Sequence, residues 1–280
     1  MIELGKYNLL EVARSTPHGL YLEDKEGNDV LLPGKFIPEG TAVGDYLEVY
    51  IYRDNEERLV ATTEEPKITL YEFASLKVSD VSEHGAFVDY GVGKDLFIPF
   101  REQKVAMEVD KYYLVYMYLD GQTDRLAGST KIEQFLDLVD VEEDVVEVGD
   151  EVLVTVWGRS ELGTNVIVNN RYKGLIYANE LFENLKVGMT RAAYIHRVRE
   201  DGKLDIRLEK DGYAKVEDNA QKILNLLKKR DGYLLLTDKS SPELIKKQLG
   251  MSKKTFKKSI GALYKQKRIS LEDRGIRLLE

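Results

Sequence analysis

The side chains best suited to acid–base or metal chemistry in this 280-residue chain are three histidines, His18, His84 and His196. The chain contains no cysteine, which excludes thiol catalysis, disulfide bonds and cysteine-ligated zinc. It also contains no H-E-x-x-H pattern, no glycine-rich phosphate loop and no nucleophile elbow. His18 and His84 open the similar phrases HGLYLED and HGAFVDYG, so they hold equivalent places in a repeat and need not converge. We therefore expect no enzymatic activity, no metal and no cofactor.

Charge is distributed unevenly along the chain, which as a whole carries a formal charge of −8. Residues 1–67 hold 7 basic and 14 acidic residues, and residues 68–144 hold 7 and 16. Residues 145–212 are nearly balanced, with 10 and 11, whereas residues 213–280 hold 17 basic and 8 acidic residues. A basic end on an acidic body predicts a polyanionic partner at that end. The alternative is a lysine-rich surface that serves only solubility.

The phrase at His18 recurs 66 residues later, and the similarity continues on both sides of it. Matches at this offset include Asp29 with Asp95, Pro33 with Pro99 and Tyr50 with Tyr116. A second offset, of 78 residues, carries the middle unit onto a third, and its matches include Gly85 with Gly163 and Ile98 with Ile176. We interpret these ordered matches as three tandem units, 1–67, 68–144 and 145–212, followed by a separate domain, 213–280.

Each of the three units has the alternating pattern of short β-strands. In the middle unit these are LKVSDVSEHGAFVDYG with its bend at glycine, then KDLFIPF, YYLVYMYLD and RLAGS. Five short strands in about 65 residues predict a small closed or partly closed barrel. The acidic run DLVDVEEDVVEVGDE, residues 137–151, lies between the second and third units. Because it lacks the glycine spacing of an EF-hand, we interpret it as a solvated linker.

The phrase VSDVSEHGAFVDYGVGKDLFIPFRE resembles the signature of the S-one RNA-binding domain, a five-stranded OB-fold barrel. The resemblance implies a binding face built from aromatic side chains, and it assigns base stacking to His84 and Phe87 in the second unit and to His18 and Tyr21 in the first. In the third unit Leu162 and Asn165 replace the two aromatics, and Tyr177 takes the place where the family has a histidine. Pro33 and Pro99 stand at that place in the first two units.

The third unit and the C-terminal domain carry the basic residues that such a face would need. OB-type barrels bind single strands by stacking bases beside a basic groove. We expect Arg171, Lys173, Tyr177, Arg197 and Arg199 to contact RNA in the third unit. Trp157, the single tryptophan, could either stack on a base or pack in the core. One or two of the three barrels could instead be structural spacers or protein-docking modules.

From Lys215 the hydrophobic period changes to that of helices. Ala220, Ile223, Leu224 and Leu227 form one stripe. LLLTDKS predicts a short strand, and Ser241, Pro242 and Gly250 predict the N-cap, first position and end of a second helix. A third helix begins after Ser252 and buries Phe256, Ile260 and Leu263, and a hairpin turning at Asp273, Arg274 and Gly275 ends the chain. This order is that of a winged helix.

The third of these helices would present a row of lysines to solvent. We expect RNA contacts from Lys253, Lys254, Lys257, Lys258 and Lys265, and from Arg274 in the hairpin. Lysines bind phosphates without reading bases. No Asn, Gln or Arg accompanies them early in the helix, which favours sequence-tolerant binding over base-specific reading.

Three S-one-like barrels followed by a winged helix resemble, over nearly the whole chain, the conserved virulence factor B family of bacterial RNA-binding proteins. The resemblance implies a non-enzymatic regulator that binds RNA and influences gene expression. From the composition and the barrels we expect a cytoplasmic protein that binds single-stranded RNA. The predicted fold class is mainly β with a small α+β end. A DNA-binding transcription regulator and a protein scaffold using the acidic barrels are the alternatives. No run approaches the ~20 apolar residues of a membrane span, so no membrane partner is expected.

Overall fold

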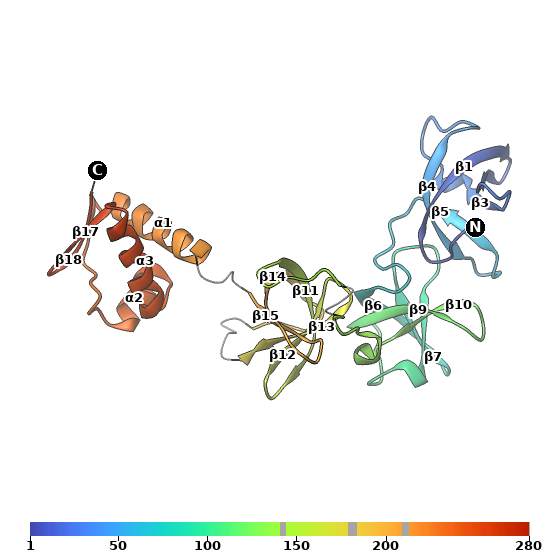
Figure 1. Cartoon of the computed structure of the whole chain (residues 1–280). Coiled ribbons are helices and arrows are strands. Elements are labelled where there is room, and N and C mark those ends of the chain that lie inside the picture. Colours follow the sequence, from blue (N-terminus) through green and yellow to red (C-terminus); the bar gives the residue numbers. More distant parts are fainter. Residues whose placement is uncertain (141–143, 179–183, 209–212, 280) are drawn as a thin grey trace. The chain divides into compact units, whose positions relative to one another are not determined.

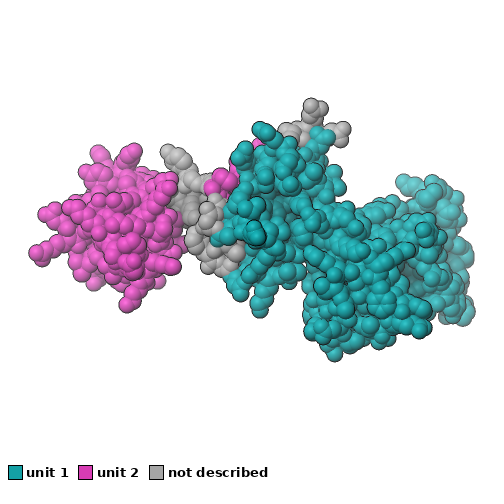
Figure 2. Space-filling view, turned by 90° about the horizontal axis from the view of Figure 1, so that it is seen from below, with its two compact units in different colours: residues 1–146, 152–192, 197–206 teal, residues 147–151, 193–196, 207–280 magenta. Residues whose placement is uncertain are grey.

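The computed structural model of the chain describes residues 1–140, 144–178, 184–208 and 213–279 (Figure 1). Its contacts define two compact units, which Figure 2 distinguishes by colour. One unit comprises residues 1–146, 152–192 and 197–206, and the other comprises 147–151, 193–196 and 207–280. No helix in the part of the chain that the structure describes is long and apolar enough to cross a membrane.

Three closed five-stranded barrels follow one another along the chain, as the repeat predicts. The first consists of β1 (Tyr7–Thr16), β2 (Gly19–Glu23), β3 (Asp29–Pro33), β4 (Tyr46–Arg53) and β5 (Leu59–Thr62). The second consists of β6 (Phe73–Val81), β7 (Gly85–Asp89), β8 (Leu96–Pro99), β9 (Tyr112–Asp120) and β10 (Arg125–Ser129). The third consists of β11 (Glu151–Ser160), β12 (Gly163–Val168), β13 (Tyr172–Tyr177), β14 (Thr190–Val198) and β15 (Leu204–Arg207). The mainly β fold class is thus confirmed, and the predicted domain boundaries stay predictions.

The three barrels share one register, down to a β-bulge in the first strand. The pairing of first and second strands shifts between Val12 and Arg14, between Val78 and Asp80, and between Val156 and Gly158. The second strand of each barrel begins at a glycine that faces the end of the third strand, as Gly85 faces Pro99. A Cβ on Gly85 would lie 2.3 Å from the carbonyl oxygen of Ile98, so the two strands approach too closely for a side chain. The corner that the sequence predicts at glycine is therefore a steric requirement.

The first and second barrels share a buried cluster of side chains. Tyr50 and Tyr52 on β4 and Val60 on β5 pack with residues of the second barrel, among them Tyr90 and Met117. The rings of Tyr50 and Tyr90 lie 6.5 Å apart, edge to face. Burial raises the pKa of both phenols, so both stay neutral. The outer face of β4 and β5 is therefore used to join the first barrel to the second.

The C-terminal domain has the winged-helix order: α1 (Tyr213–Lys229), β16 (Tyr233–Leu234), α2 (Pro242–Leu249), α3 (Lys253–Lys265), β17 (Ile269–Glu272) and β18 (Gly275–Leu278). Ser241 and Ser252 cap α2 and α3 as predicted, each accepting a hydrogen bond from a backbone N–H three residues on. Gly250 ends α2 in the left-handed conformation, at φ 66°. The buried residues of α3 include Phe256, Ile260 and Leu263, as expected.

Two details of this domain differ from the sequence prediction. The strand expected over LLLTDKS comprises only Tyr233–Leu234, because Thr237 and Ser240 hydrogen-bond to each other in a turn. The hairpin turn comprises two residues, Asp273 and Arg274, because Gly275 already pairs with Glu272 in the ladder.

The corner glycine generates a test of the barrel geometry. Gly85→Ala should destabilise the second barrel by about 1–3 kcal/mol, because its methyl group would overlap backbone atoms of β8. The measurement is the urea midpoint followed by the fluorescence of Trp157, the one tryptophan of the chain. Gly121→Ala is the control, since its Cβ would meet nothing within 4 Å. Equal midpoints for the two variants would contradict the close approach.

Candidate nucleic-acid interface

Each barrel presents one row of outward side chains at the same register, which we call the outer row. It consists of a residue on the second strand, its partner on the third strand and that residue's partner on the fifth. The rows are Tyr21, Leu31 and Val60 in the first barrel, Phe87, Phe97 and Ala127 in the second, and Asn165, Leu175 and Asp205 in the third. Because the rows are equivalent, their side chains show directly what each barrel can contact.

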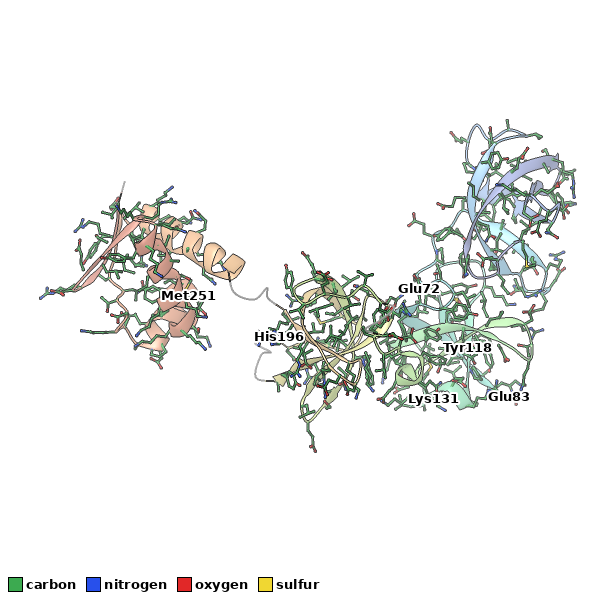
Figure 3. The ribbon with its side chains drawn as sticks, viewed as in Figure 1. Glu72, Glu83, Tyr118, Lys131, His196 and Met251 are labelled. Atoms are coloured by element: carbon green, nitrogen blue, oxygen red, sulfur yellow. The ribbon has the colours of Figure 1, made fainter. Side chains whose placement is uncertain are left out.

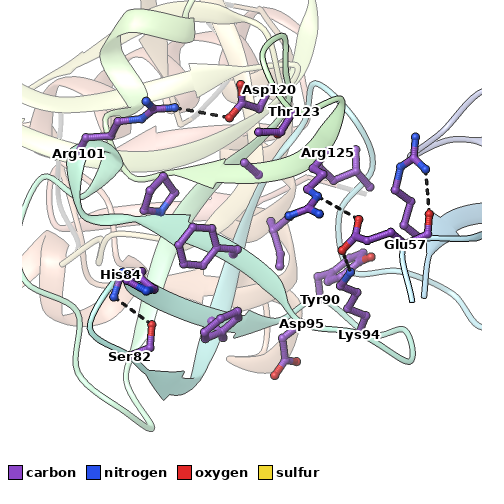
Figure 4. A pocket seen from close by; sticks show the side chains of 17 residues that line it. Glu57, Ser82, His84, Tyr90, Lys94, Asp95, Arg101, Asp120, Thr123 and Arg125 are labelled. Carbon is purple, nitrogen blue, oxygen red and sulfur yellow. Dashed lines mark hydrogen bonds and ion pairs between the residues drawn. The ribbon is translucent and has the colours of Figure 1, made fainter. Parts of the chain in front are cut away.

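The outer row of the second barrel carries two aromatic rings beside a pocket. The rings of Phe87 and Phe97 lie 5.2 Å apart, tilted by 43°. They line a pocket of about 420 Å³, together with His84 (Figure 4). The side chain of His84 is 77% exposed, and its Nε2 lies 3.5 Å from Oε1 of Glu83. Ala127 pairs with Tyr118 on the neighbouring strand β9 (labelled in Figure 3). The ring of Tyr118 stacks on that of Phe135, with 5.9 Å between the ring centroids.

Cations surround this pocket, and each is paired with a carboxylate. Arg101 lies 3.5 Å from Asp120. At the other end, Glu57 on the β4–β5 turn of the first barrel accepts from Lys94 at 2.9 Å and lies 3.0 Å from Nε of Arg125. The hydrogen bond from Lys94 lowers the pKa of Glu57, and the charges of Lys94 and Arg125 act in the same direction. The first barrel therefore supplies one wall of the second barrel's pocket (Figure 4).

The outer row of the first barrel is largely covered by the chain itself. The guanidinium of Arg14 lies over the ring of Tyr21, 4.0 Å from its centroid, and donates to Asp29 at 2.6 Å. Val60 is only 5% exposed, because it belongs to the cluster shared with the second barrel. His18 is exposed at the corner. Of the two stacking residues predicted here, only His18 thus has an uncovered side chain.

The outer row of the third barrel has no aromatic side chain. Asn165 and Leu175 replace the two rings, and Asp205 is 6% exposed with no hydrogen-bond partner for its Oδ1. Tyr177 is half-buried at the end of β13, opposite Gly163. This row is therefore poorly suited to stacking.

Most of the basic residues predicted to bind RNA in the third barrel are held by acidic residues. Arg171 pairs with Asp137 at 2.8 Å and with Asp144 at 3.3 Å. Lys173 pairs with Glu133, and its hydrogen bond lowers the pKa of that carboxyl group. Arg199 and Lys203 both pair with Asp201. Arg197 is exposed and makes no ion pair with the residues that the structure describes.

The acidic run 137–151 is consequently not a solvated linker throughout, which corrects the sequence interpretation. Asp137 exchanges backbone hydrogen bonds with Arg171 and Lys173, at 3.0 Å each, and so bridges to β13. Val139 is buried and donates its backbone N–H to Gly202. The acidic run has no sustained alternation of apolar and polar residues, so nothing in the sequence indicated that Asp137 pairs with β13. Residues 141–143 of the run lie outside the described residues.

Trp157, for which packing and stacking were both open, lies against side chains of the second barrel. It packs on a buried cluster of Phe73, Leu114, Ile132 and Ile167. Its indole Nε1 is buried without a partner, and Nζ of Lys104 lies 5.8 Å from the ring centroid. The packing interpretation is the one that these contacts favour.

The lysines of α3 contrast with the paired cations of the barrels. Lys254, Lys258 and Lys265 are exposed and make no ion pair with any described carboxylate. Lys257 lies 3.7 Å from Asp238, a loose pair, and the half-buried Lys253 donates to the backbone oxygen of Lys239. Arg274 is exposed in the β17–β18 turn. This helix therefore offers the largest group of unneutralised positive charge among the predicted site residues.

Sequence reasoning missed Phe97, Arg101 and Arg125 as parts of the second barrel's pocket. The repeat alignment contained the signal for Phe97, because it places Phe97 against Leu31 and Leu175. Pairing Phe87 with Phe97 across β7 and β8 would have found the double aromatic row. Nothing local marked the two arginines, which reach the pocket from η2 (Phe100–Glu102) and from the start of β10.

Known protein families match three parts of the chain. An S1 domain family matches residues 4–64, an S1 RNA binding domain family matches residues 77–171, and a CvfB-like winged helix domain family matches residues 221–278. The chain is therefore a protein built from S1-type barrels and a winged helix. Both are domain types of nucleic-acid-binding proteins, and neither is a catalytic family.

Three bacterial proteins are similar to this chain over nearly its whole length. Conserved virulence factor B of Staphylococcus saprophyticus is 28% identical over 290 residues, which cover 99% of this chain and 95% of that protein. The Staphylococcus aureus USA300 protein of the same name is 26% identical, covering 98% and 94%. An uncharacterized protein, YitL, of Bacillus subtilis is 28% identical, covering 96% and 91%. Together with the matching winged helix, these similarities confirm the resemblance that the sequence predicts: over nearly its whole length the chain is similar to conserved virulence factor B proteins.

Among solved structures, a multidomain protein with nucleic acid binding domains from Streptococcus pneumoniae TIGR4 is similar to this chain. Its TM-score is 0.41 at 23% sequence identity, over 99% of this chain and 98% of that one.

The ion pairs of Glu57 generate a pH test. Because pairing lowers the folded-state pKa of Glu57 below the ordinary 4.5, its stabilisation is complete above that value and is lost as the pH falls through the lowered pKa. Glu57→Gln should therefore be less stable than the native protein at pH 7, and the difference should vanish in acid. Urea unfolding from pH 7 to pH 3 measures it, with Glu56→Gln as the control for a 71% exposed neighbour. A stability difference that is constant over this range would contradict the pairing.

Proposed function

We propose that this protein is a non-enzymatic, cytoplasmic regulator of gene expression that binds single-stranded RNA. The observation that carries the proposal is the outer row of the second barrel, where Phe87 and Phe97 lie side by side next to an open pocket. Base stacking on such aromatics contributes about 1–3 kcal/mol per base and tolerates any sequence. The match of residues 77–171 to an S1 RNA binding domain supports the same ligand class.

The chemistry of the pocket suits a base and its phosphate together. The two phenylalanine rings present apolar faces, and His84 adds a third ring at the corner. Arg101 and Arg125 lie at the two ends, where their guanidinium groups, 62% and 59% exposed, can meet backbone phosphates. Both are already paired with carboxylates, so phosphate must compete with Asp120 and Glu57. We therefore expect modest affinity from this barrel alone.

The winged helix supplies a second contact surface, on α3. Its exposed Lys254, Lys258 and Lys265 make no ion pair with a described carboxylate, so their charge can attract phosphate and release counterions. Lysine-to-phosphate contacts position a strand without specifying its bases. The third barrel contributes less than its composition implies, because Arg171, Lys173 and Arg199 are engaged in ion pairs.

Duplex DNA is the competing ligand, because winged helices belong to the helix-turn-helix proteins that place a helix in the major groove. Competition by an unlabelled duplex against a labelled single-stranded RNA distinguishes the two ligands. Displacement at concentrations below those of unlabelled RNA would favour DNA. A stoichiometric protein partner, with no nucleic acid, would instead favour a docking role for the acidic barrels.

Removing the aromatic row tests the stacking contact. Phe87→Ala and Phe97→Ala should each weaken the binding of a short single-stranded RNA by about 1 kcal/mol or more, roughly fivefold. Fluorescence anisotropy of a labelled oligonucleotide measures the affinity. Tyr21→Ala is the matched control, because Arg14 already covers that ring in the equivalent row. If Phe87→Ala and Tyr21→Ala behaved alike, the second barrel would not be the stacking site.

Reversing charge on α3 tests the phosphate contact. The triple variant Lys254→Glu, Lys257→Glu and Lys258→Glu should bind RNA more weakly and with a smaller dependence on salt, since each lost phosphate contact removes about 0.7 from the logarithmic slope. The affinity is measured between about 50 and 300 mM salt, a range over which such slopes are resolved. Lys222→Glu, Lys228→Glu and Lys229→Glu on α1 make the same charge change elsewhere in the domain. Equal losses in both triple variants would show that net charge, and not the α3 surface, governs binding.

A further inference from the structure

Gly261 is partly exposed and lies on the side of α3 that faces away from its buried residues. Because helix neighbours are three and four residues apart, it is surrounded on the helix surface by Lys257, Lys258, Tyr264 and Lys265. We call these four residues and Gly261 the α3 platform. Lys257, Lys258, Tyr264 and Lys265 are all exposed. The platform therefore has three cations and one aromatic ring around a position with no side chain.

Nothing in the described fold requires glycine at this position. A Cβ on Gly261 would meet no atom within 4 Å, and the residue lies within the helix, without a positive φ. Glycine in a helix interior is less stable than alanine there. The corner glycines of the barrels differ, because a Cβ at Gly85 would collide with the backbone. The space beside Gly261 is therefore open, and a glycine there permits the close approach of a ligand.

Tyr264 is the aromatic member of the platform and is 56% exposed. It belongs to no aromatic pair and makes no side-chain hydrogen bond in the part of the chain that the structure describes. Helical side chains lean towards the N-terminus of their helix, over the preceding turn. For Tyr264 that turn carries Gly261 three residues earlier, so no side chain covers the ring there.

We infer that the α3 platform is a single-strand binding site, where the nucleic-acid backbone lies against Gly261 and a base stacks on Tyr264. The inference rests on the proposed function and specifies its contact on the winged helix. Lys257, Lys258 and Lys265 hold the phosphates on either side of the stacked base. The ligand must expose a base, because a duplex keeps its bases stacked inside. The platform thus favours single-stranded over duplex ligands.

Two substitutions in the whole chain test the site: one adds a methyl group at Gly261, and the other removes the aromatic ring of Tyr264. Gly261→Ala should raise the thermal midpoint of the helices by a few degrees, because alanine is the better helix former. The same variant should bind single-stranded RNA severalfold more weakly, because its methyl group holds the backbone away. Tyr264→Leu should weaken RNA binding by about fivefold, the equivalent of about 1 kcal/mol of stacking. Its salt slope should stay that of the native protein, because no charge changes.

The probes are a labelled 12-nucleotide single-stranded RNA, followed by anisotropy, and circular dichroism at 222 nm. The described helices α1, α2 and α3 all belong to the winged helix, so the dichroism signal reports that domain. Gly121→Ala and Tyr112→Leu are matched controls in the second barrel, at an open glycine and at a tyrosine that is 68% exposed. Tyr264→Phe keeps the ring and should bind as the native protein does.

The outcomes separate the inference from the proposed function. If the native protein binds no single-stranded RNA, the proposed function fails. If it binds and the triple lysine variant weakens binding, but Gly261→Ala and Tyr264→Leu bind like their controls, only the platform is overturned. If Gly261→Ala lowers the thermal midpoint, the RNA affinity of Tyr264→Leu is the deciding measurement: weakened binding supports the platform, and native binding overturns it. A raised midpoint together with weakened binding supports the site.

Discussion

The close approach of the second and third strands at the barrel corner is the constraint on which the remaining structure depends. A Cβ at Gly19, Gly85 or Gly163 would lie 2.0–2.3 Å from a backbone oxygen of the facing strand. No side chain fits there, so the two strands can pair in one register only, and a slip by one residue would exchange the inner and outer faces. That register places alternate residues in the core and the others in the outer row. The chemistry that each barrel offers thus follows from a steric fact about its glycine.

Pairing of charges then decides which cations can act on a ligand. A cation held by a carboxylate contributes less to phosphate binding, because the ligand must displace the partner first. The barrels keep Arg171, Lys173 and Arg125 in such pairs, and several of these pairs join one barrel to its neighbour. The lysines of α3 have few carboxylates near them, since the described part of the winged helix after Ala220 holds five acidic residues against sixteen basic ones. Net charge alone does not distinguish these two situations.

The features predictable from sequence are those that depend on neighbours along the chain. Local pattern predicts the corner glycines, the helix caps at Ser241 and Ser252, and the buried stripe of α3. For the corner glycines the pattern occurs three times, once in each barrel. Contacts between distant segments leave no such trace. Arg14 is seven residues from Tyr21, and its position over the ring depends on the hairpin and on Asp29 beyond it. Asp137 meets Arg171 across 34 residues, so the acidic run reads as a linker until the fold brings the two together.

Repetition of one register also explains how three similar barrels can do different work. In the first barrel Val60 of the outer row is buried against the second barrel, as are Tyr50 and Tyr52 beside it. The guanidinium of Arg14 covers the ring of Tyr21. The second barrel keeps its row open, and the turn of the first barrel that bears Glu57 becomes a wall of its pocket. The third barrel replaces its rings by Asn165 and Leu175 and turns its flank to the second barrel through Trp157 and Ile167. An outer row whose side chains pack against a neighbouring barrel cannot bind a ligand. Of the three barrels, only the second therefore keeps an open aromatic face. A second ligand surface then has to come from a domain whose exposed side chains are not used to join barrels. The lysines of α3 form such a surface.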